Sequence, residues 1–409
     1  MNFESKVVHA GDRKRKKGAA IPSTTPIHLG TTFFYDSAAT LDRVLGTPEE
    51  GFSYARYSSP TNEALEELTT AIEGGYGSLA TCSGMAAVQI ALQTALMDRS
   101  HTIVAAHAIY GATVGLLDQI LSPFDVQVKY TDICDLDGFA KCVEQNKPGC
   151  VFLESISNPL LRVGNLSRIA EISQRVGAAV VVDNTFATPM MMKPLEFGAN
   201  LVVHSATKYL AGHGDVLGGI VVSDRQHNET LRKISRIAGP QLGPFESYLT
   251  MRGIKTLAVR FERQCQNAKI LAEWLASHPA VERVYYCSDA AHPDAENIRR
   301  FFTPGTFGAI FSFEIKGANK ETVLQFMDAL KMVVPGTSLG DVHTLLLYPL
   351  IASHRNVSPK MRDRMGIREN LVRVAAGIEN VEDIREDIDQ ALKAISAVAQ
   401  PETAVTQAV

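Results

Sequence analysis

Short apolar runs, separated by helical patterns, constrain the fold of this chain more than any other feature of its sequence. They cover Thr102–Ala106, Cys150–Glu154, Ala179–Val182, Leu201–His204 and Gly219–Val222. These runs are rich in Val and Ile and show little polar alternation, as is typical of strands buried on both faces of a sheet. Strand–helix alternation on this scale predicts a mostly parallel sheet with helices on both sides.

The sequence changes in texture after about residue 245. The expected elements there are a helix over Ile254–Ala276, strands over Val281–Tyr286 and Ala309–Ile315, and helices over Lys320–Leu330 and Val381–Val398. Strands and helices that are segregated in this way predict a smaller α+β domain at the C-terminus.

Length and composition narrow the class of protein. A chain of 409 residues with net charge −4 is long enough for about two or three domains and has no general attraction to nucleic acid or membranes. No apolar stretch of about 18 residues and no secretory signal is visible, so we expect a cytoplasmic protein. The basic run Arg13–Lys17 reads as a solvated part of an N-terminal arm, with a nucleic-acid patch or targeting signal as the alternative. The six cysteines form no Cys-x-x-Cys pair, so we expect neither disulfides nor a metal site.

Polar side chains follow two of the predicted strands, at the point where each strand ends. Asp183 comes directly after one strand, and Ser205, Thr207 and Lys208 follow the next. Ligands of such folds bind at the carboxyl ends of the strands. A lysine can form a Schiff base, a carboxylate can keep a pyridine nitrogen protonated, and hydroxyls can bind phosphate, so this set suits a phosphorylated aromatic cofactor. The alternative is a helix cap at Asp183 and a surface lysine at 208.

A helix start supplies a candidate phosphate cradle. Ser83-Gly84-Met85 opens an apolar helix over Ala86–Leu96, so backbone N–H groups at its N-terminus are available to bind an anion. A Ser-Gly helix start is common, so it indicates a phosphate site only in combination with the two strand ends described above.

Together these segments resemble the Cys/Met metabolism family of pyridoxal-phosphate enzymes. This family includes cystathionine γ-synthases, cystathionine and methionine γ-lyases, and O-acylhomoserine sulfhydrylases. The similarity runs over nearly the whole chain. Its motifs here are Tyr54–Thr61, Ser83-Gly84-Met85, Ser157-Asn158-Pro159, Asp183–Phe186, Ser205–Tyr209, Gly212-His213, Arg252-Gly253, Ser338-Leu339-Gly340 and Gly377-Ile378-Glu379.

The resemblance implies an α/β fold of the aspartate-aminotransferase type (fold type I). Its mostly parallel, seven-stranded type of sheet would be accompanied by a smaller α+β C-terminal domain. Residues 1–60 would form an arm that contributes to a neighbouring subunit, 61–250 the cofactor domain and 251–409 the small domain. The active unit would be a dimer within a homotetramer.

The resemblance also implies the cofactor, pyridoxal 5′-phosphate, and the residues that hold it. Lys208 would bond the cofactor and shuttle protons, Asp183 would pair with its ring nitrogen, and Tyr110 would stack on the ring and assist the leaving group. The remaining cofactor residues would be Gly84, Met85, Ser205 and Thr207 at the phosphate, Asn158 near the 3-oxygen, and Tyr54 and Arg56 from the neighbouring subunit.

The substrate would be a small amino acid, and the resemblance implies where it binds. Arg373 would clamp its carboxylate through a bidentate guanidinium. The other expected substrate residues are Ser338, Asn158, Ser53 and His343. Family members that handle cystathionine commonly carry acidic residues where this chain has Ser53 and His343. At these two positions the chain therefore supplies no fixed negative charge for the ammonium of a cysteinyl group.

Further departures from the family pattern affect specificity. Ser58-Ser59 replaces the usual Gly-Asn, and Val374-Ala375 follows Arg373 where a serine is frequent. Ala112 occupies the position of the reactive cysteine of methionine γ-lyases, which counts against a dedicated methionine γ-lyase. His204, His213 and Asp215 could be imagined as metal ligands, but structural hydrogen bonding explains them better beside a lysine-bound cofactor.

The sequence thus predicts an enzyme of γ-replacement or γ-elimination on an activated homoserine or sulfur amino acid. The alternative within the family is a cystathionine or methionine γ-lyase that releases a 2-keto acid and ammonia. An aminotransferase and a non-catalytic cofactor-binding protein are the alternatives from other classes.

Overall fold

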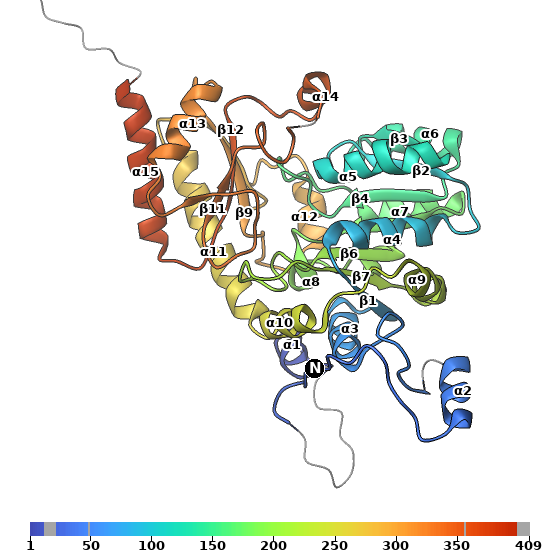
Figure 1. The fold of residues 1–409 in the computed structure, drawn as a ribbon. Coiled ribbons are helices and arrows are strands. Elements are labelled where there is room, and N and C mark those ends of the chain that lie inside the picture. The colour runs from blue at the N-terminus through green and yellow to red at the C-terminus, as the bar shows by residue number, and fades with distance from the viewer. Residues whose placement is uncertain (12–21, 48–49, 356, 399–409) are drawn as a thin grey trace, which may run out of the picture. The chain divides into compact units, whose positions relative to one another are not determined.

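The structure is a computed structural model that describes residues 1–11, 22–47, 50–355 and 357–398 (Figure 1). The basic run Arg13–Lys17 lies outside the described residues. The chain divides into two compact units. Unit 1 comprises Met1–Asn158, Arg162–Phe261 and Pro293–Thr306, and unit 2 comprises Pro159–Leu161, Glu262–His292 and Phe307–Val409. The division of the chain into an N-terminal arm, a cofactor domain and a small domain, which was expected from the sequence, stays a prediction.

Unit 1 is built on a seven-stranded sheet with the order β1-β7-β6-β5-β4-β2-β3. The strands are β1 (Gly77–Thr81), β2 (Thr102–Ala106), β3 (Gln127–Thr131), β4 (Cys150–Glu154), β5 (Ala179–Asp183), β6 (Leu201–Ser205) and β7 (Gly219–Ser223). All neighbours are parallel except the two pairs that involve β7, which runs antiparallel to β1 and β6. This confirms the predicted mostly parallel sheet, with every predicted strand of this region in place.

The central strands form because their side chains are apolar on both faces. Val180, Val181 and Val182 of β5 have no exposed surface, and the same holds for Leu201, Val202 and Val203 of β6. β-branched residues pack well on such a pleated, fully covered surface. These strands end in polar side chains, Asp183 on β5 and His204 and Ser205 on β6.

Most helices of unit 1 connect or flank these strands, whereas α2 stands apart from the sheet (Figure 1). They are α1 (Phe3–His9), α2 (Ala38–Gly46), α3 (Pro60–Glu73), α4 (Gly84–Leu96), α5 (Gly111–Gly115), α6 (Leu136–Asn146), α7 (Leu166–Arg175), α8 (Thr188–Met191), α9 (Arg225–Ala238), α10 (Pro244–Ile254) and α12 (Ala295–Phe301), with a π-helix η2 (Leu116–Leu121) and 3₁₀ turns η3 (Ser122–Phe124) and η4 (Pro194–Phe197). Helix α4 matters most for the site, because it packs on β5, β6 and β7. Its first turn is capped by the Ser83 side chain, which accepts from the N–H of Ala86.

Unit 2 contains a five-stranded sheet with the order β10-β11-β12-β9-β8. Its strands and helices are β8 (Val281–Tyr285), β9 (Ile310–Ile315), β10 (Val334–Pro335), β11 (Leu345–Leu347), β12 (Leu371–Ala375), α13 (Lys320–Ala329), α14 (Pro359–Arg364) and α15 (Val381–Val398). Helix α11 (Leu257–Ala276) begins in unit 1 and belongs to unit 2 from Glu262 onward. Side chains of the sheet, α11, α13 and α15 share one apolar core that includes Phe311, Phe313 and Phe326. The mixture of strands and helices confirms the predicted α+β character of this region.

The predicted helix over Ile254–Ala276 was wrong at its start. Helix α10 ends at Ile254, and α11 begins at Leu257, with the N–H of Lys255 bonded to the carbonyl of Met251. The apolar pattern continues across this break, which hid it from a periodicity argument. Within the described residues, no helix has the length and apolar character needed to cross a bilayer.

Candidate active site

The ends of β5 and β6 are joined by one threonine. Thr185 donates to Oδ1 of Asp183 through both its N–H (3.0 Å) and its hydroxyl (2.5 Å). The same hydroxyl oxygen accepts from the N–H of Ser205 at 2.8 Å. Because β5 and β6 are parallel neighbours, their carboxyl ends lie at the same edge of the sheet. The structure therefore brings Asp183 and Ser205 together, as the sequence predicted.

Burial of the Asp183 carboxyl dominates its electrostatics. Removal from water raises the pKa of Asp183 above its ordinary value, while the hydrogen bonds from Thr185 and the proximity of His204 oppose this rise. A carboxylate in this condition favours a cationic partner, because such a partner would offset the cost of burying its charge. A protonated pyridine nitrogen is a partner of that kind.

His204 lies on the opposite face of β6 from Ser205, since successive strand side chains alternate. Its Nε2 lies 3.1 Å from Oε2 of Glu73, and Asn184 donates to the other oxygen of that carboxylate. His213 lies with its Nδ1 2.7 Å from the carbonyl of Ala211. These contacts are the structural hydrogen bonds expected for the two histidines.

The start of α4 approaches the end of β6 so closely that only glycine fits. A Cβ on Gly84 would lie 2.8 Å from Cβ and 2.9 Å from Oγ of Ser205, which is inside van der Waals contact. Ala86 and Ala87 donate to Ser83. The N–H groups of Gly84 and Met85 precede both, at positions that have no acceptor within a helix. Helix N–H groups and the Ser205 hydroxyl thus form a cradle suited to an anion.

Lys208 lies in the turn that follows β6. Its N–H donates to the carbonyl of Ser205, and its own carbonyl accepts from the N–H of Gly212. The neighbouring Thr207 is tied to the strand that returns, because its hydroxyl accepts from the N–H of Gly218 at 3.0 Å. Both residues are half-buried, beside the cradle formed by Gly84 and Ser205.

Tyr110 lies just before α5, at the end of the segment that follows β2. Its N–H donates to Oε1 of Glu154 at 2.6 Å, and its side chain is 43% exposed. Helix α5 is linked to α4 by Thr113, whose hydroxyl lies 4.0 Å from the sulfur of Met85. Asn158 is buried in the segment after β4. These contacts connect Tyr110 to the same sheet edge and to the phosphate cradle.

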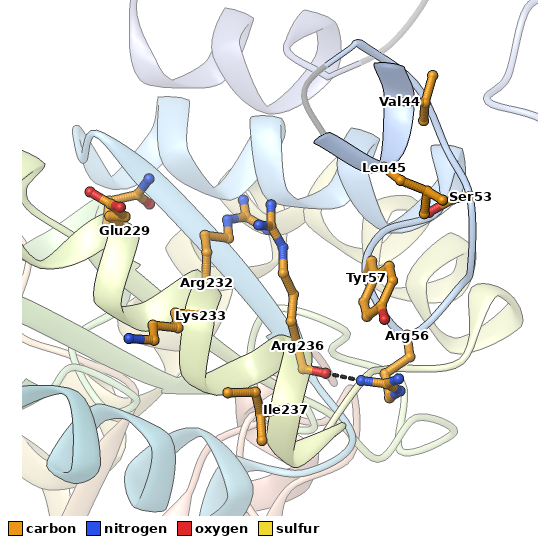
Figure 2. A pocket seen from close by; sticks show the side chains of 11 residues that line it. Val44, Leu45, Ser53, Arg56, Tyr57, Glu229, Arg232, Lys233, Arg236 and Ile237 are labelled. Carbon is orange, nitrogen blue, oxygen red and sulfur yellow. Dashed lines mark hydrogen bonds between the residues drawn. The ribbon is translucent and has the colours of Figure 1, made fainter. Parts of the chain in front are cut away.

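The N-terminal residues Ser53 and Arg56 lie beside α9 of unit 1. They line a hollow of about 620 Å³ together with Tyr57, Arg232 and Arg236, and the cradle residues are not part of its lining. Figure 2 shows the guanidinium of Arg56 donating to the main-chain carbonyl of Arg236. Tyr54 is 44% exposed, and the Arg56 guanidinium carbon lies 5.6 Å from the centre of its ring. Arg56 also accepts from Nε2 of Gln241 at 2.7 Å through its main-chain carbonyl.

Unit 2 carries three of the residues expected to bind substrate, Arg373, Ser338 and His343. Arg373 on β12 is 2% exposed, and its guanidinium donates to the carbonyl of Ser338 at 3.0 Å. His343 is exposed, with its Nδ1 3.5 Å from Oδ1 of Asp341. Arg373 and Ser338 are therefore neighbours, as expected of two residues of one substrate subsite.

Two residues of the site escaped the sequence argument. Thr185 stood inside the motif Asp183–Phe186, but its bond to Ser205 joins residues of different strands and has no local pattern. Glu154 ends a predicted strand, in register with Asp183 on the next. Glu154 is a charged residue at the end of a buried strand, as Asp183 is, and this shared pattern could have identified it as a site residue.

The residues present fit the phosphorylated aromatic cofactor that the sequence predicted. The cradle between Gly84 and Ser205 has room for no side chain at position 84, as a backbone that approaches a phosphate requires. The carboxylate, the lysine and the cradle belong to adjacent segments of one sheet edge.

Comparisons with known proteins agree with this geometry. Residues 4–393 match the family model described as Cys/Met metabolism PLP-dependent enzyme. The chain is 38% identical to an L-methionine gamma-lyase of Fusobacterium nucleatum subsp. polymorphum, over 95% of this chain and 97% of that protein. It is 35% identical to an O-succinylhomoserine sulfhydrylase of Pseudomonas aeruginosa, over 96% of each. A cystathionine gamma synthase structure from Xanthomonas oryzae pv. oryzae, in complex with cystathionine, superposes with a TM-score of 0.89 at 34% identity, over 97% of this chain and 99% of that one.

A match over nearly the whole length, several full-length relatives above 30% identity and the shared fold lead to one conclusion: this chain belongs to the Cys/Met metabolism family of PLP-dependent enzymes.

Proposed function

We propose that this enzyme carries out γ-replacement or γ-elimination on an activated homoserine or a sulfur amino acid. Similar proteins of both kinds support this proposal, since they include a sulfhydrylase, a γ-synthase and γ-lyases. Replacement is favoured over methionine elimination by Ala112, which stands where methionine γ-lyases carry a reactive cysteine. A γ-lyase that releases a 2-keto acid and ammonia is the second candidate, supported by the 38% identity to a methionine γ-lyase.

One observation carries the proposal: a buried carboxylate, a lysine and a helix-start anion cradle share the edge of one sheet. Asp183, Ser205 and Lys208 belong to β5, β6 and the turn after β6, and Thr185 bonds the two strand ends. Pyridoxal 5′-phosphate bound there supplies an electron sink for the pair left when a proton leaves the substrate.

Each of these residues has a separate task in the proposed reaction. Asp183, kept ionised, would hold a proton on the ring nitrogen. Lys208 would attach the cofactor through its amine and, once displaced by the substrate amine, would take the proton from Cα. It would pass that proton to C4′ of the cofactor, and its freed amine would then remove a proton from Cβ, so that the γ-substituent can leave. Proton transfers of this kind need a group whose pKa lies near the working pH.

The remaining residues would bind and orient. Gly84, Met85, Ser205 and Thr207 would hold the phosphate. Asn158 would lie near the 3-oxygen, and Tyr110 would stack on the ring. Arg373 would hold the substrate carboxylate, because a planar guanidinium matches two carboxylate oxygens. Its bond to the Ser338 carbonyl supports this proposal by fixing the plane of the guanidinium.

A homotetramer of two active dimers is part of the proposal, with Tyr54 and Arg56 reaching the phosphate site of the neighbouring subunit. The observation in support is that Arg56 lines a hollow beside α9 whose lining includes none of the cradle residues of its own chain. The cytoplasmic location expected from the sequence stays a prediction.

The test is a substrate panel. O-acetyl-, O-succinyl- and O-phosphohomoserine, cystathionine and methionine would each be supplied with and without a thiol, and keto acid and thioether products measured together. Thioether from an activated homoserine plus thiol supports replacement, and keto acid without thiol supports elimination. Amino-group transfer to an added keto acid, with no γ-product from any substrate, would overturn the proposal. An absorption spectrum of the bound cofactor that does not change with any substrate of the panel would overturn it as well.

A further inference from the structure

Glu154 is a buried carboxylate to which the proposed reaction gives no task. It is the last residue of β4 and is 7% exposed. Its Cα is in register with that of Asp183 on β5, so both side chains leave the same face of the sheet at the same edge. A buried charge is costly unless hydrogen bonds satisfy it, so its position calls for a specific partner.

One such partner is the backbone of Tyr110, which lies far from Glu154 in the sequence. Oε1 of Glu154 accepts from the N–H of Tyr110 at 2.6 Å, short for an N–H···O bond, as charge-assisted bonds are. On its other side, the Tyr110 carbonyl accepts from the N–H of Thr113 at 2.9 Å and of Val114 at 3.2 Å. The backbone of Tyr110 is thus held at both peptide groups, by β4 and by α5.

Among the described residues, the Tyr110 ring makes no hydrogen bond or ring contact that would hold it in the same way. Tyr110 is 43% exposed in the single chain. The direction in which Cα–Cβ leaves the backbone therefore determines where the ring can lie. Because Glu154 and Asp183 occupy paired positions, the residue that holds the Tyr110 backbone stands beside the residue proposed to hold the cofactor's ring nitrogen.

We propose that Glu154 is a positioning residue that fixes the Tyr110 backbone at the carboxyl edge of the sheet. From there the tyrosine ring would stack on the cofactor ring that Asp183 is proposed to bind. This inference rests on the proposed function in two respects, the stacking role of Tyr110 and the binding of the cofactor ring by Asp183. The restraint itself belongs to the protein without ligand.

Two variants separate the restraint from general stability. Glu154→Gln keeps an oxygen acceptor of the same length, whereas Glu154→Leu removes it at similar volume. Misplacement of a catalytic group by about 1 Å can cost on the order of 100-fold in rate. We expect Glu154→Leu to lose about 10- to 100-fold in kcat, and Glu154→Gln to stay within about 3-fold of the unmodified enzyme.

Hydrogen exchange of the cofactor-free protein provides a readout independent of activity. The peptide that contains Tyr110 should exchange slowly in the unmodified protein and in Glu154→Gln, and faster in Glu154→Leu. Glu314→Leu is the matched control. Glu314 is also a fully buried carboxylate, but it bonds Tyr285 and Arg368 in unit 2. Its loss should lower stability without changing exchange at Tyr110.

A double-mutant cycle then tests whether Glu154 acts through Tyr110. In a Tyr110→Ala background, Glu154→Leu should weaken binding of pyridoxal 5′-phosphate, measured as Kd, by less than about 2-fold further. Full additivity, or unchanged exchange at Tyr110 in Glu154→Leu, would overturn the inference. Should Glu154→Leu fail to fold, Glu154→Asn is the substitute. Its side chain is one methylene group shorter, so its oxygen acceptor no longer reaches the N–H of Tyr110, and the same results are expected. Exchange and Kd do not need turnover, so a failure of the proposed γ-chemistry is distinguishable from a failure here.

Discussion

Asp183 offers two carboxylate oxygens, and Thr185 occupies one of them with both its N–H and its hydroxyl. The hydroxyl has a single proton. Since its oxygen already accepts from Ser205, that proton points at Oδ1 of Asp183. A ligand that donates a hydrogen bond to this carboxylate therefore meets Oδ2. One threonine thereby sets which oxygen of Asp183 faces a cofactor.

The raised pKa of Asp183 leads to a prediction for the cofactor-free protein. The folded state holds a proton on this carboxyl more tightly than the unfolded state, so stability falls as pH rises through the folded pKa. Asp183→Asn removes this titration and keeps an oxygen that can accept from Thr185. We therefore expect the cofactor-free variant to be more stable than the unmodified protein near neutral pH, with the difference shrinking as the pH is lowered.

Urea unfolding of both cofactor-free proteins at a series of pH values measures this difference. An unmodified protein that is the more stable of the two at neutral pH would contradict the prediction. The cofactor-loaded proteins should show the reverse order, because Asn cannot offset a charged ring nitrogen.

Lys208→Ala should abolish turnover and the visible absorption band of the lysine-bound cofactor. The reason is that an alanine offers no amine, either to bond the cofactor or to carry the substrate proton. Lys129→Ala is a matched control, since Lys129 is an exposed residue of β3. Normal turnover by purified Lys208→Ala would show the assignment to be wrong.

At the scale of elements, the site depends on how closely α4 approaches β6. Gly84→Ala places a methyl group 2.8 Å from Cβ of Ser205, so either the helix start or the strand end must shift. We expect about a 10-fold or larger rise in the Kd for pyridoxal 5′-phosphate, because donors displaced from an anion lose charge-assisted bonds of about 1.5–3 kcal/mol. Gly46→Ala is the control, because a Cβ there meets nothing within 4 Å. Equal affinities for Gly84→Ala and the unmodified protein would contradict the prediction.

The elements that sequence alone predicted are those with a strong one-dimensional pattern. Buried Val- and Ile-rich runs identified β2, β4, β5, β6 and β7, and with them the positions of Asp183 and Ser205. Strand β3 was missed because Gln127 and Lys129 are exposed at its edge of the sheet, which left no continuous apolar run. Hydrogen bonds between distant segments, such as Glu154 to Tyr110, have no sequence period and required the structure.

At the scale of the whole molecule, we predict that the active site is shared between subunits. Arg56 contacts the carbonyl of Arg236 and the ring of Tyr57 in its own chain, and it would exchange these contacts for a neighbour's phosphate. Inactive Arg56→Ala and inactive Lys208→Ala subunits, when mixed, should recover part of the activity, because some hybrid sites would be intact. No recovery despite proven subunit exchange, followed by mass spectrometry, would count against sharing.

Specificity toward the second substrate is also a property of the assembled enzyme. Ser53 and His343 stand where relatives that handle cystathionine commonly carry acids, so we predict poor use of cysteine as nucleophile and poor release of it from cystathionine. A missing charge-assisted contact costs about 1.5–3 kcal/mol, a ten-fold preference or more. Sulfide or methanethiol, which have no ammonium group, would lose nothing.

Rates with cysteine and with small thiols, for each activated homoserine, test this prediction. Ser53→Glu should raise the use of cysteine. Asp341 is a carboxylate beside His343, and its Oδ1, which lies 3.5 Å from Nδ1 of His343, accepts from the N–H of Val342 at 2.6 Å. Asp341→Asn therefore shows whether it supplies the charge instead. A strong preference of the unmodified enzyme for cysteine over small thiols would contradict the prediction.

The reversed direction of β7 has a consequence for the order in which the molecule assembles. Strand β7 returns antiparallel beside β6, so the segment with Lys208 is closed by strands that are near in sequence, and Thr207 bonds Gly218 across the return. Closing a short loop costs less chain entropy than pairing parallel strands across a helical crossover. We expect the attachment lysine to reach its native surroundings early in folding. Tyr110 would become fixed only later, when β4 pairs with β2. During folding, Lys208 would therefore be in place before the ring of Tyr110 is positioned.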